Sequence, residues 1–399
     1  MSYQTLYVGI DVSKYKHDIA IVNEQKQFVG RPFVIKDDLN GYQHLIGKVD
    51  ELMRRYHTQQ FYIGLESTGD YWKNIYYYLK QQPQPFVVTV INPVQTRAHA
   101  KSELRRASTD AVNARDIALF MAEKQPKASF DRAPILDNIK DLDRQIYQLK
   151  KQQTMTVNKL RIELTKVAPE IEKNVSNIQG KQILALLAEF PTAELIANSS
   201  FQQLATIRYG KNNWTLSAPF VEKIKSLSQH SIAYKTGLGA GYAVQSLVRC
   251  IWQFQREIQW LKSQLVKLYQ RVTDQESLLA TIPAISRETA ILLEAYIGDV
   301  HRFPNAKKFV AYFGMNPTVC TSGKSKRSSY LQKKGNAMVR HKLFMAVLGM
   351  IRREIDPIHG YYKRLIDAGK PKLVAIGAAM RKLLVIMYYM LSKNEPFKN

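Results

Sequence analysis

Three acidic residues in the first third of the chain have the types and positions of metal ligands. Asp11 and Glu66 each follow a short run of apolar residues. Asp110 begins a segment in which Asn113 follows three residues later. If the two apolar runs are neighbouring strands, their carboxylates lie side by side, and a helix would put the other two side chains on one face. Mg²⁺ prefers oxygen ligands, with one or two carboxylates beside substrate phosphates. The four residues therefore predict a Mg²⁺ site for phosphoryl transfer.

Asn113 is the one member of this set without a charge. Its amide oxygen can bind Mg²⁺, but the side chain cannot act as a base. Asp116 follows closely, although it is off the helix face that carries Asp110. Taken alone, each acid is more typical of a solvated strand end or a helix cap than of a metal ligand. Because Asn113 lacks a charge, the alternative is a site that binds metal more weakly, has altered chemistry or is inactive.

A serine in a basic loop near the C-terminus is the candidate nucleophile. The basic residues that follow Ser322 in this loop are Lys324, Lys326, Arg327, Lys333 and Lys334. A serine hydroxyl that attacks phosphorus needs cations to hold the nonbridging oxygens. The alternative is a basic loop that binds phosphate without chemistry. Arg340 and Lys342, slightly further on, are expected to contact a nucleic-acid backbone as well.

The composition favours a polyanionic partner. Among 399 residues, 58 Lys and Arg stand against 33 Asp and Glu, which gives a formal charge of +25 and a pI near 9.8. Such an excess is typical of proteins that bind nucleic acid. A generally basic soluble protein and a membrane-surface protein are the alternatives. The two cysteines, Cys250 and Cys320, are far apart, which indicates a reducing compartment without a disulfide framework.

The most apolar late stretch, 373–391, is interrupted at its centre by Arg381 and Lys382. Charges at the centre of a lipid bilayer are costly, so this stretch predicts a buried helix rather than a membrane span. The first residues lead directly into a strand pattern without the features of a signal peptide. We therefore expect a cytoplasmic, nucleoid-associated protein with no membrane partner.

Five short segments rich in β-branched residues predict a mixed sheet in the N-terminal third. They are Leu6–Asp11, His17–Val22, Gln27–Val34, Phe61–Glu66 and Phe86–Asn92. Helical spacing of apolar residues predicts a helix over 38–55. Three strands followed by alternating helix and strand suit an α/β fold with helices on the faces of the sheet. Apolar runs in the last two strands fit a sheet covered on both sides.

The middle of the chain is predicted to be helical. Residues 135–164 and 251–272 repeat apolar residues at alternating spacings of three and four, and the second run contains three heptads. This pattern predicts a coiled-coil seam, either within one antiparallel helix pair or between subunits. The segments 178–205 and 282–313 resemble each other as hairpins of short helices, which indicates an internal repeat. The alternating glycines of 237–241 predict a flexible loop.

Motifs along nearly the whole chain resemble those of DEDD-type insertion-sequence transposases and recombinases. In the first third they are Gly9-Ile10-Asp11-Val12-Ser13, Leu65-Glu66-Ser67-Thr68-Gly69-Asp70-Tyr71, Val90-Ile91-Asn92-Pro93 and Thr109-Asp110-Ala111-Val112-Asn113-Ala114. In the last third they are Ile282-Pro283, Tyr296-Ile297-Gly298-Asp299, Arg302-Phe303, Phe313-Gly314-Met315-Asn316-Pro317, Ser322-Gly323, Lys334-Gly335-Asn336 and Arg381-Lys382-Leu383-Leu384. The family is the one-hundred-and-ten family of insertion sequences, which includes the Piv-like DNA invertases. Two motif sets in the family's order make the resemblance specific.

The resemblance implies an α/β RNase H/RuvC-like N-terminal domain, followed by coiled-coil helices and an all-α helical C-terminal transposase domain. We place these domains at 1–125, at 126–275 with an inserted helical hairpin subdomain, and at 276–399. The resemblance also implies double-stranded DNA and a guide called a bridge RNA as partners. Composite sites between subunits are expected, and hence a homo-oligomer, either a dimer or a tetramer.

The family's site residues transfer to this chain position by position. Asp11, Glu66, Asp110 and Asn113 fill the acidic tetrad that binds Mg²⁺, although the family pattern has Asp where Asn113 stands. Ser322 fills the nucleophile position, which implies a covalent phosphoserine–DNA intermediate.

The function expected from the motifs is RNA-guided recombination of DNA that excises and inserts a mobile element. A catalytically weakened nucleic-acid-binding protein, motivated by Asn113, and a RuvC-like metal-dependent nuclease are the alternatives. An ATPase of the actin or sugar-kinase type also opens with a motif like Gly9-Ile10-Asp11. The charge of +25 and the lack of a second glycine-rich phosphate loop argue against that fold.

Overall fold

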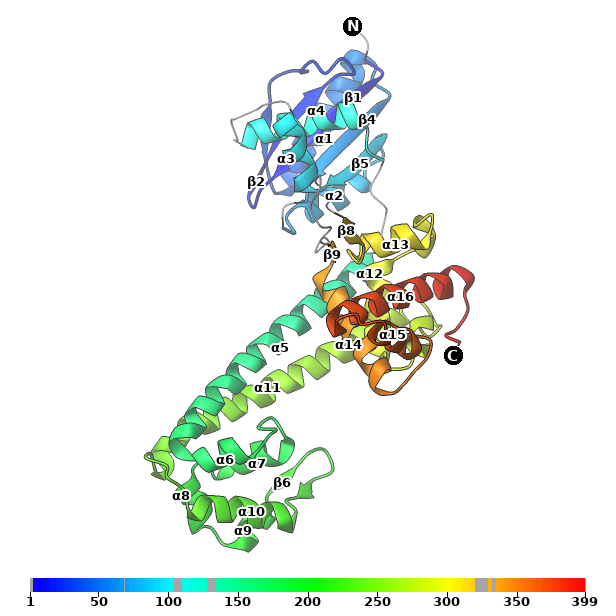
Figure 1. The fold of residues 1–399 in the computed structure, drawn as a ribbon. Coiled ribbons are helices and arrows are strands. Elements are labelled where there is room, and N and C mark those ends of the chain that lie inside the picture. Colours follow the sequence, from blue (N-terminus) through cyan, green and yellow to red (C-terminus); the bar gives the residue numbers. More distant parts are fainter. Residues whose placement is uncertain are drawn as a thin grey trace. The chain divides into compact units, whose positions relative to one another are not determined.

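A computed structural model describes residues 3–67, 69–102, 110–127, 134–319, 329–331 and 335–398. By its contacts the chain, drawn in Figure 1, divides into two compact units, Met1–Asp131 and Arg132–Asn399. Each unit has hydrophobic cores of its own. The domain boundaries predicted at 125/126 and 275/276 remain predictions.

The first unit is built on a five-stranded mixed sheet. Its strands are β1 (Thr5–Val12), β2 (Lys16–Val22), β3 (Phe33–Lys36), β4 (Gln60–Glu66) and β5 (Phe86–Ile91). The order across the sheet is β3-β2-β1-β4-β5. The first three strands form an antiparallel meander, whereas β4 and β5 run parallel to β1. This is the topology of the RNase H/RuvC-like fold, so the fold class predicted for the N-terminal domain is confirmed.

Helices cover both faces of this sheet. They are α1 (Leu39–Tyr56), α2 (Trp72–Lys80), α3 (Pro93–Ser102) and α4 (Asp110–Lys124). Leu6, Val8 and Ile10 of β1 share a core with buried residues of α1 and α2. Tyr7, on the opposite face, shares a smaller core with α4. Because the side chains of a strand alternate between its faces, Asp11 points to the α4 side.

The third strand was predicted over Gln27–Val34, and this position is wrong. In the structure β3 is Phe33–Lys36, and only an isolated bridge joins Phe28 to β2. Gly30 adopts a φ of +77°, and Pro32 has no N–H to donate, so the segment between them cannot continue a ladder. Pairing with β2 resumes only after the proline.

The second unit is organised around two long helices, α5 (Pro134–Val167) and α11 (Gly237–Gln270), which run antiparallel (Figure 1). Ile258, Leu261 and Leu265 of the predicted seam are buried against α5. The seam therefore joins two helices of one chain. Its last predicted member, Val272, lies beyond the end of α11 and is 43% exposed.

The alternating glycines of 237–241 do not form the predicted loop, because they lie in the first turns of α11. A Cβ atom on Gly241 would lie 2.2 Å from Cγ of Pro191, so this glycine permits close packing of α11 on the loop after α7 (Lys181–Glu189).

A small subdomain is inserted between the two long helices. Its elements are α6 (Pro169–Asn174), α7, α8 (Ala193–Asn198), α9 (Phe201–Ala205), β6 (Arg208–Tyr209), β7 (Trp214–Thr215) and α10 (Ala218–Gln229). Its core continues onto the end of α5 at Leu160 and Leu164 and onto the start of α11 at Val244 and Val248. The subdomain is thus anchored at the end of the helix pair where α5 ends and α11 begins.

Short and long helices at the other end of the pair form the C-terminal core. They are η1 (Leu278–Thr281), α12 (Arg287–Ile297), η2 (Val300–Arg302), α13 (Ala306–Tyr312), α14 (Ala337–Arg352), α15 (Ile358–Asp367) and α16 (Lys372–Lys393), with a two-stranded ribbon of β8 (Pro317–Val319) and β9 (Ser329–Leu331). By length and composition, α16 could cross a membrane. However, Ala379, Leu383 and Met387 are fully buried in this core. The prediction of a buried helix over 373–391 is therefore confirmed.

Candidate metal and nucleic-acid sites

Asp11 and Glu66 lie at the carboxyl ends of adjacent parallel strands. The pairs of β1 and β4 run from Thr5–Gln60 to Ile10–Leu65, so these two acids are the next residues on their strands. In open α/β sheets this edge is where ligands bind. Both side chains are partly exposed. The structure thus brings together the first two predicted metal ligands, which are 55 residues apart in sequence.

The close approach of α4 to β1 brings the first turns of the helix over the end of the strand. A Cβ atom on Gly9 would lie 2.2 Å from the carbonyl O of Ala114 and 2.3 Å from the N of Ala118. Only a glycine fits there. Gly9 and Asp11 face the same side of the sheet because they are two residues apart. Asn113, which precedes Ala114, therefore reaches Asp11, and its Nδ2 donates a hydrogen bond to Oδ2 of Asp11 at 3.1 Å.

Glu66 is held on the same side of the sheet. Gly64, two residues earlier, leaves space for Met121 of α4, whose Cγ would lie 2.6 Å from a Cβ atom at this glycine. The hydroxyl of Thr96 on α3 donates a hydrogen bond to Oε2 of Glu66 at 3.0 Å. Because Thr96 is only 5% exposed, the carboxylate is oriented by a well-packed partner.

A further carboxylate at this edge was not predicted. Asp18 of β2 is paired with Asp11 across the antiparallel ladder, so the two side chains are on the same face. Asp18 is 6% exposed, and its Oδ2 lies 3.5 Å from Nζ of Lys16. The sequence contains a signal for Asp18. If β1 and β2 are assumed to form a hairpin around the short turn at 13–15, counting residue pairs outward from the turn places Asp18 opposite Asp11.

The oxygen donors at this edge fit a divalent metal ion. Asp11 and Glu66 offer carboxylates. Asn113 offers an amide, and a rotation of this amide group by about 180° would present its oxygen to a metal. Mg²⁺ commonly uses one or two carboxylates, with waters and substrate phosphates in the other positions. Within the described residues, no group of three His, Cys, Asp or Glu side chains is placed to hold a metal ion. The side chain of Asp110, the fourth predicted ligand, lies outside the described residues.

The predicted serine loop also lies outside the described residues. This applies to Ser322, Lys324, Lys326, Arg327, Lys333 and Lys334. Their roles remain predictions.

Two basic residues after the loop make contacts within the protein. Nη1 of Arg340 lies 3.5 Å from the carbonyl O of Phe313. Nζ of Lys342 lies 2.8 Å from Oδ1 of Asp143, a carboxylate that is 3% exposed. These contacts fix the two side chains at the start of α14. Their predicted contact with a nucleic-acid backbone remains a prediction.

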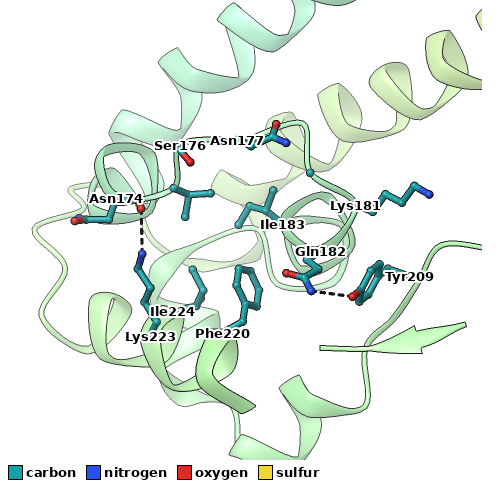
Figure 2. Close-up of a pocket in the computed structure, with 12 residues that line it drawn as sticks. Asn174, Ser176, Asn177, Lys181, Gln182, Ile183, Tyr209, Phe220, Lys223 and Ile224 are labelled. Atoms are coloured by element: carbon teal, nitrogen blue, oxygen red, sulfur yellow. Dashed lines mark hydrogen bonds between the residues drawn. The ribbon is translucent and has the colours of Figure 1, made fainter. Parts of the chain in front are cut away.

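The inserted subdomain contains a basic concavity that the sequence did not indicate. It is a cavity of about 450 Å³ between the start of α7, the hairpin β6–β7 and α10 (Figure 2). Lys181 and Lys223 line it, and no carboxylate does. Nζ of Lys223 donates to the carbonyl O of Asn174 at 3.3 Å, and Nε2 of Gln182 donates to the hydroxyl of Tyr209 at 2.8 Å. Among the residues that line the cavity, none is a carboxylate that could pair with Lys223.

Comparison with known proteins identifies relatives of both parts of the chain. A family model described as a transposase, for the DEDD domain of IS110 elements, matches residues 8–169. A second, described as the transposase IS116/IS110/IS902 family, matches residues 276–363. The pilin gene-inverting protein of Moraxella bovis is 24% identical over 392 residues, which cover 98% of this chain and 97% of the relative.

Two further comparisons are more limited. The transposase for insertion sequence element IS1111A of Coxiella burnetii is 26% identical over 121 residues, covering 30% of this chain and 33% of the relative. A solved structure of T. thermophilus RuvC in complex with a Holliday junction substrate is 13% identical and covers 31% of this chain and 98% of its own, with a TM-score of 0.24.

Proposed function

The chain belongs to the IS110 family of transposases, and from this membership we propose that it is an RNA-guided DNA recombinase that excises and inserts a mobile element. Its substrate is double-stranded DNA in the cytoplasm, and its guide is a bridge RNA. The observation that carries the proposal is the meeting of Asp11, Glu66 and Asn113 at one sheet edge, on the family's motif positions.

The sheet edge supplies the metal-dependent part of the reaction. Asp11 and Glu66, with Asn113 and Asp110, would hold Mg²⁺, which offsets negative charge on the scissile phosphate. Thr96 keeps Glu66 oriented toward the site through its hydrogen bond. Asn113 fixes the position of Asp11 without adding charge, so the four motif positions carry one carboxylate fewer than the family's tetrad.

The serine loop supplies the nucleophile in this proposal. The hydroxyl oxygen of Ser322 forms a bond to phosphorus, the bond from phosphorus to a DNA ester oxygen breaks, and the serine proton leaves to a base or water. One DNA end then stays attached to the protein through a phosphoserine. Attack by the hydroxyl of the partner strand reverses these steps and joins new ends. The basic residues of the loop support this role because they offset charge on the nonbridging oxygens.

The experiment that tests this function is strand exchange with the purified protein, its own RNA and a DNA pair that carries donor and target sites. We expect Ser322→Ala to abolish exchange and to retain RNA binding. Asp11→Asn should abolish exchange as well, because it removes a metal ligand. Undiminished exchange by Ser322→Ala would rule out the serine mechanism.

The second candidate function is a RuvC-like metal-dependent nuclease, favoured by the sheet order β3-β2-β1-β4-β5 with Asp11 and Glu66 at the ends of β1 and β4. A nuclease would leave cut DNA without rejoining, and its activity would not need Ser322. Metal-dependent cutting by Ser322→Ala, with no joined product from the unaltered protein, would therefore establish this alternative.

A further inference from the structure

In the second unit, basic residues line a cavity between α5 and α14. Its volume is about 380 Å³. Lys150 and Tyr147 of α5 line one side, and His341 and Lys342 of α14 line the other, with Asp143 between them. All of these residues belong to the same compact unit.

The one carboxylate in the lining is fully used within the protein. Oδ1 of Asp143 lies 2.8 Å from Nζ of Lys342, and the hydroxyl of Tyr296 donates to Oδ2 at 3.2 Å. Asp143 is 3% exposed. A buried carboxylate is costly without such partners. The contacts with Lys342 and Tyr296 therefore account for the burial of Asp143. Lys150 is not needed for that network.

Lys150 lines the cavity and is exposed to solvent. Within the described part of the chain, no carboxylate lies within 4.0 Å of its ammonium group. Partial desolvation lowers the pKa of Lys150, and the nearby ammonium groups of Lys262 on α11 and of Lys342 lower it further, whereas the carboxylate of Asp143 opposes this shift. The lining thus holds two lysines and one carboxylate, and that carboxylate is already paired with Lys342. An anion in the cavity would offset the repulsion between the two ammonium groups.

We infer that this cavity binds a phosphodiester group of a nucleic-acid backbone, with Lys150 as its principal donor and His341 and Lys342 beside it. The cavity is larger than a phosphate group alone. Tyr147, which is 50% exposed, is placed at its wall to contact the sugar or base attached to that phosphate. The inference deepens the proposed function and rests on it for the nature of the polymer, since nucleic acid is that function's substrate and guide.

Salt dependence of binding is the first test. The full chain is titrated into fluorescent duplex DNA, single-stranded DNA and a structured RNA, each over a range of salt concentrations. Each lysine–phosphate contact contributes about one unit to the slope of log K against log salt concentration. Lys150→Ala should lower this slope by about one for the polymer that occupies the cavity. Lys151→Ala is the matched control, because it removes the same charge from the next position of α5 without touching the cavity lining.

The outcomes are distinguishable. A loss confined to one polymer identifies duplex DNA, single strand or RNA as the source of the phosphate. Equal slopes for the two variants with all three polymers would overturn the inference, since general electrostatics would then explain binding. This test does not use strand exchange, so failure of the proposed recombination would leave its result unchanged.

Thermal stability separates a binding lysine from a structural one. Removing Lys150 relieves repulsion with Lys262 and Lys342, so the melting temperature of Lys150→Ala without added anion should equal or exceed that of the unaltered protein. Inorganic phosphate should raise the melting temperature of the unaltered protein more than that of Lys150→Ala. A lower melting temperature for Lys150→Ala, with an equal response to phosphate, would assign Lys150 a structural role and contradict the inference.

Discussion

A missing side chain at one residue, Gly9, determines where Asn113 lies. With hydrogen at this position, the backbone of α4 packs directly on β1 and its first turns reach Asp11. The hydrogen bond between Asn113 and Asp11 is therefore a consequence of helix–strand packing.

Replacement of Gly9 by alanine should separate α4 from the sheet. The new Cβ atom would collide with backbone atoms of Ala114 and Ala118, which cannot rotate away. We expect a loss of about 3 kcal/mol or more in the stability of this packing, measured as faster hydrogen exchange of α4 amides. The control is Gly47→Ala in α1, where nothing lies within 4 Å of the added atom. That change should stabilise its helix by about 0.5–1 kcal/mol. Unchanged exchange in α4 for Gly9→Ala would contradict the packing argument.

Restoring an acid at position 113 should trade stability for metal affinity. In Asn113→Asp, a second carboxylate replaces the amide that donates to Asp11. Without metal, repulsion between the two should cost about 1 kcal/mol, or about 2–4 °C in melting temperature. With Mg²⁺, the variant should gain more stability than the unaltered protein. Asn113→Ala is the control, because it loses the hydrogen bond without gaining a ligand. A smaller Mg²⁺ response in Asn113→Asp than in the unaltered protein would show that this position does not face the metal.

At the scale of elements, apolar patterning predicted most of the first unit. Both ends of four of its five strands were placed within one residue, because the side chains of these strands are buried on one or both faces. The third strand failed because it is short and lies at the sheet edge, where Gly30 and Pro32 decide the pairing more than apolar content does. Asp18 was missed for a related reason. A polar residue inside a strand can be assigned to a site only when the register between its strand and the neighbouring strand is known.

The glycines of 237–241 show another limit of local patterns. Glycine is unfavourable within a helix, so the sequence alone indicates a loop. In the structure Gly241 lies against Pro191, a contact made across 50 residues of chain. Tertiary packing therefore overrides local preference at the start of α11.

Helix α16 offers a direct comparison of buried and exposed leucines on one element. Leu383 is fully buried in the C-terminal core, whereas Leu373 is 75% exposed. Leu383→Ala should cost about 2–5 kcal/mol because it leaves a cavity. Leu373→Ala should change stability by less than about 0.5 kcal/mol. Chemical denaturation of both variants checks this prediction. Equal losses would show that α16 packs differently, as a membrane-inserted helix would.

At the scale of the whole molecule, the net charge and the order of the motifs predicted the kind of partner and the pairing of the acidic residues. The excess of 25 positive charges indicated a nucleic-acid partner before any element was known. The family's motif order identified Asp11 and Glu66 as neighbours, and the parallel pairing of β1 with β4 accounts for it. The sequence analysis predicted a nucleic-acid contact for Lys342 but not for Lys150. The two residues are 192 positions apart and line one cavity only because α5 packs on α14.

The central claim is that the serine carries the DNA end while the sheet edge holds the metal. Its most direct measurement is mass spectrometry of peptides from the protein–RNA complex after denaturation in the middle of a reaction with a DNA substrate that cannot be rejoined. We predict a DNA phosphate esterified to Ser322, absent from Ser322→Ala and from Asp11→Asn. Cut DNA with free phosphate ends and no protein adduct, or an adduct on another residue, would contradict the account.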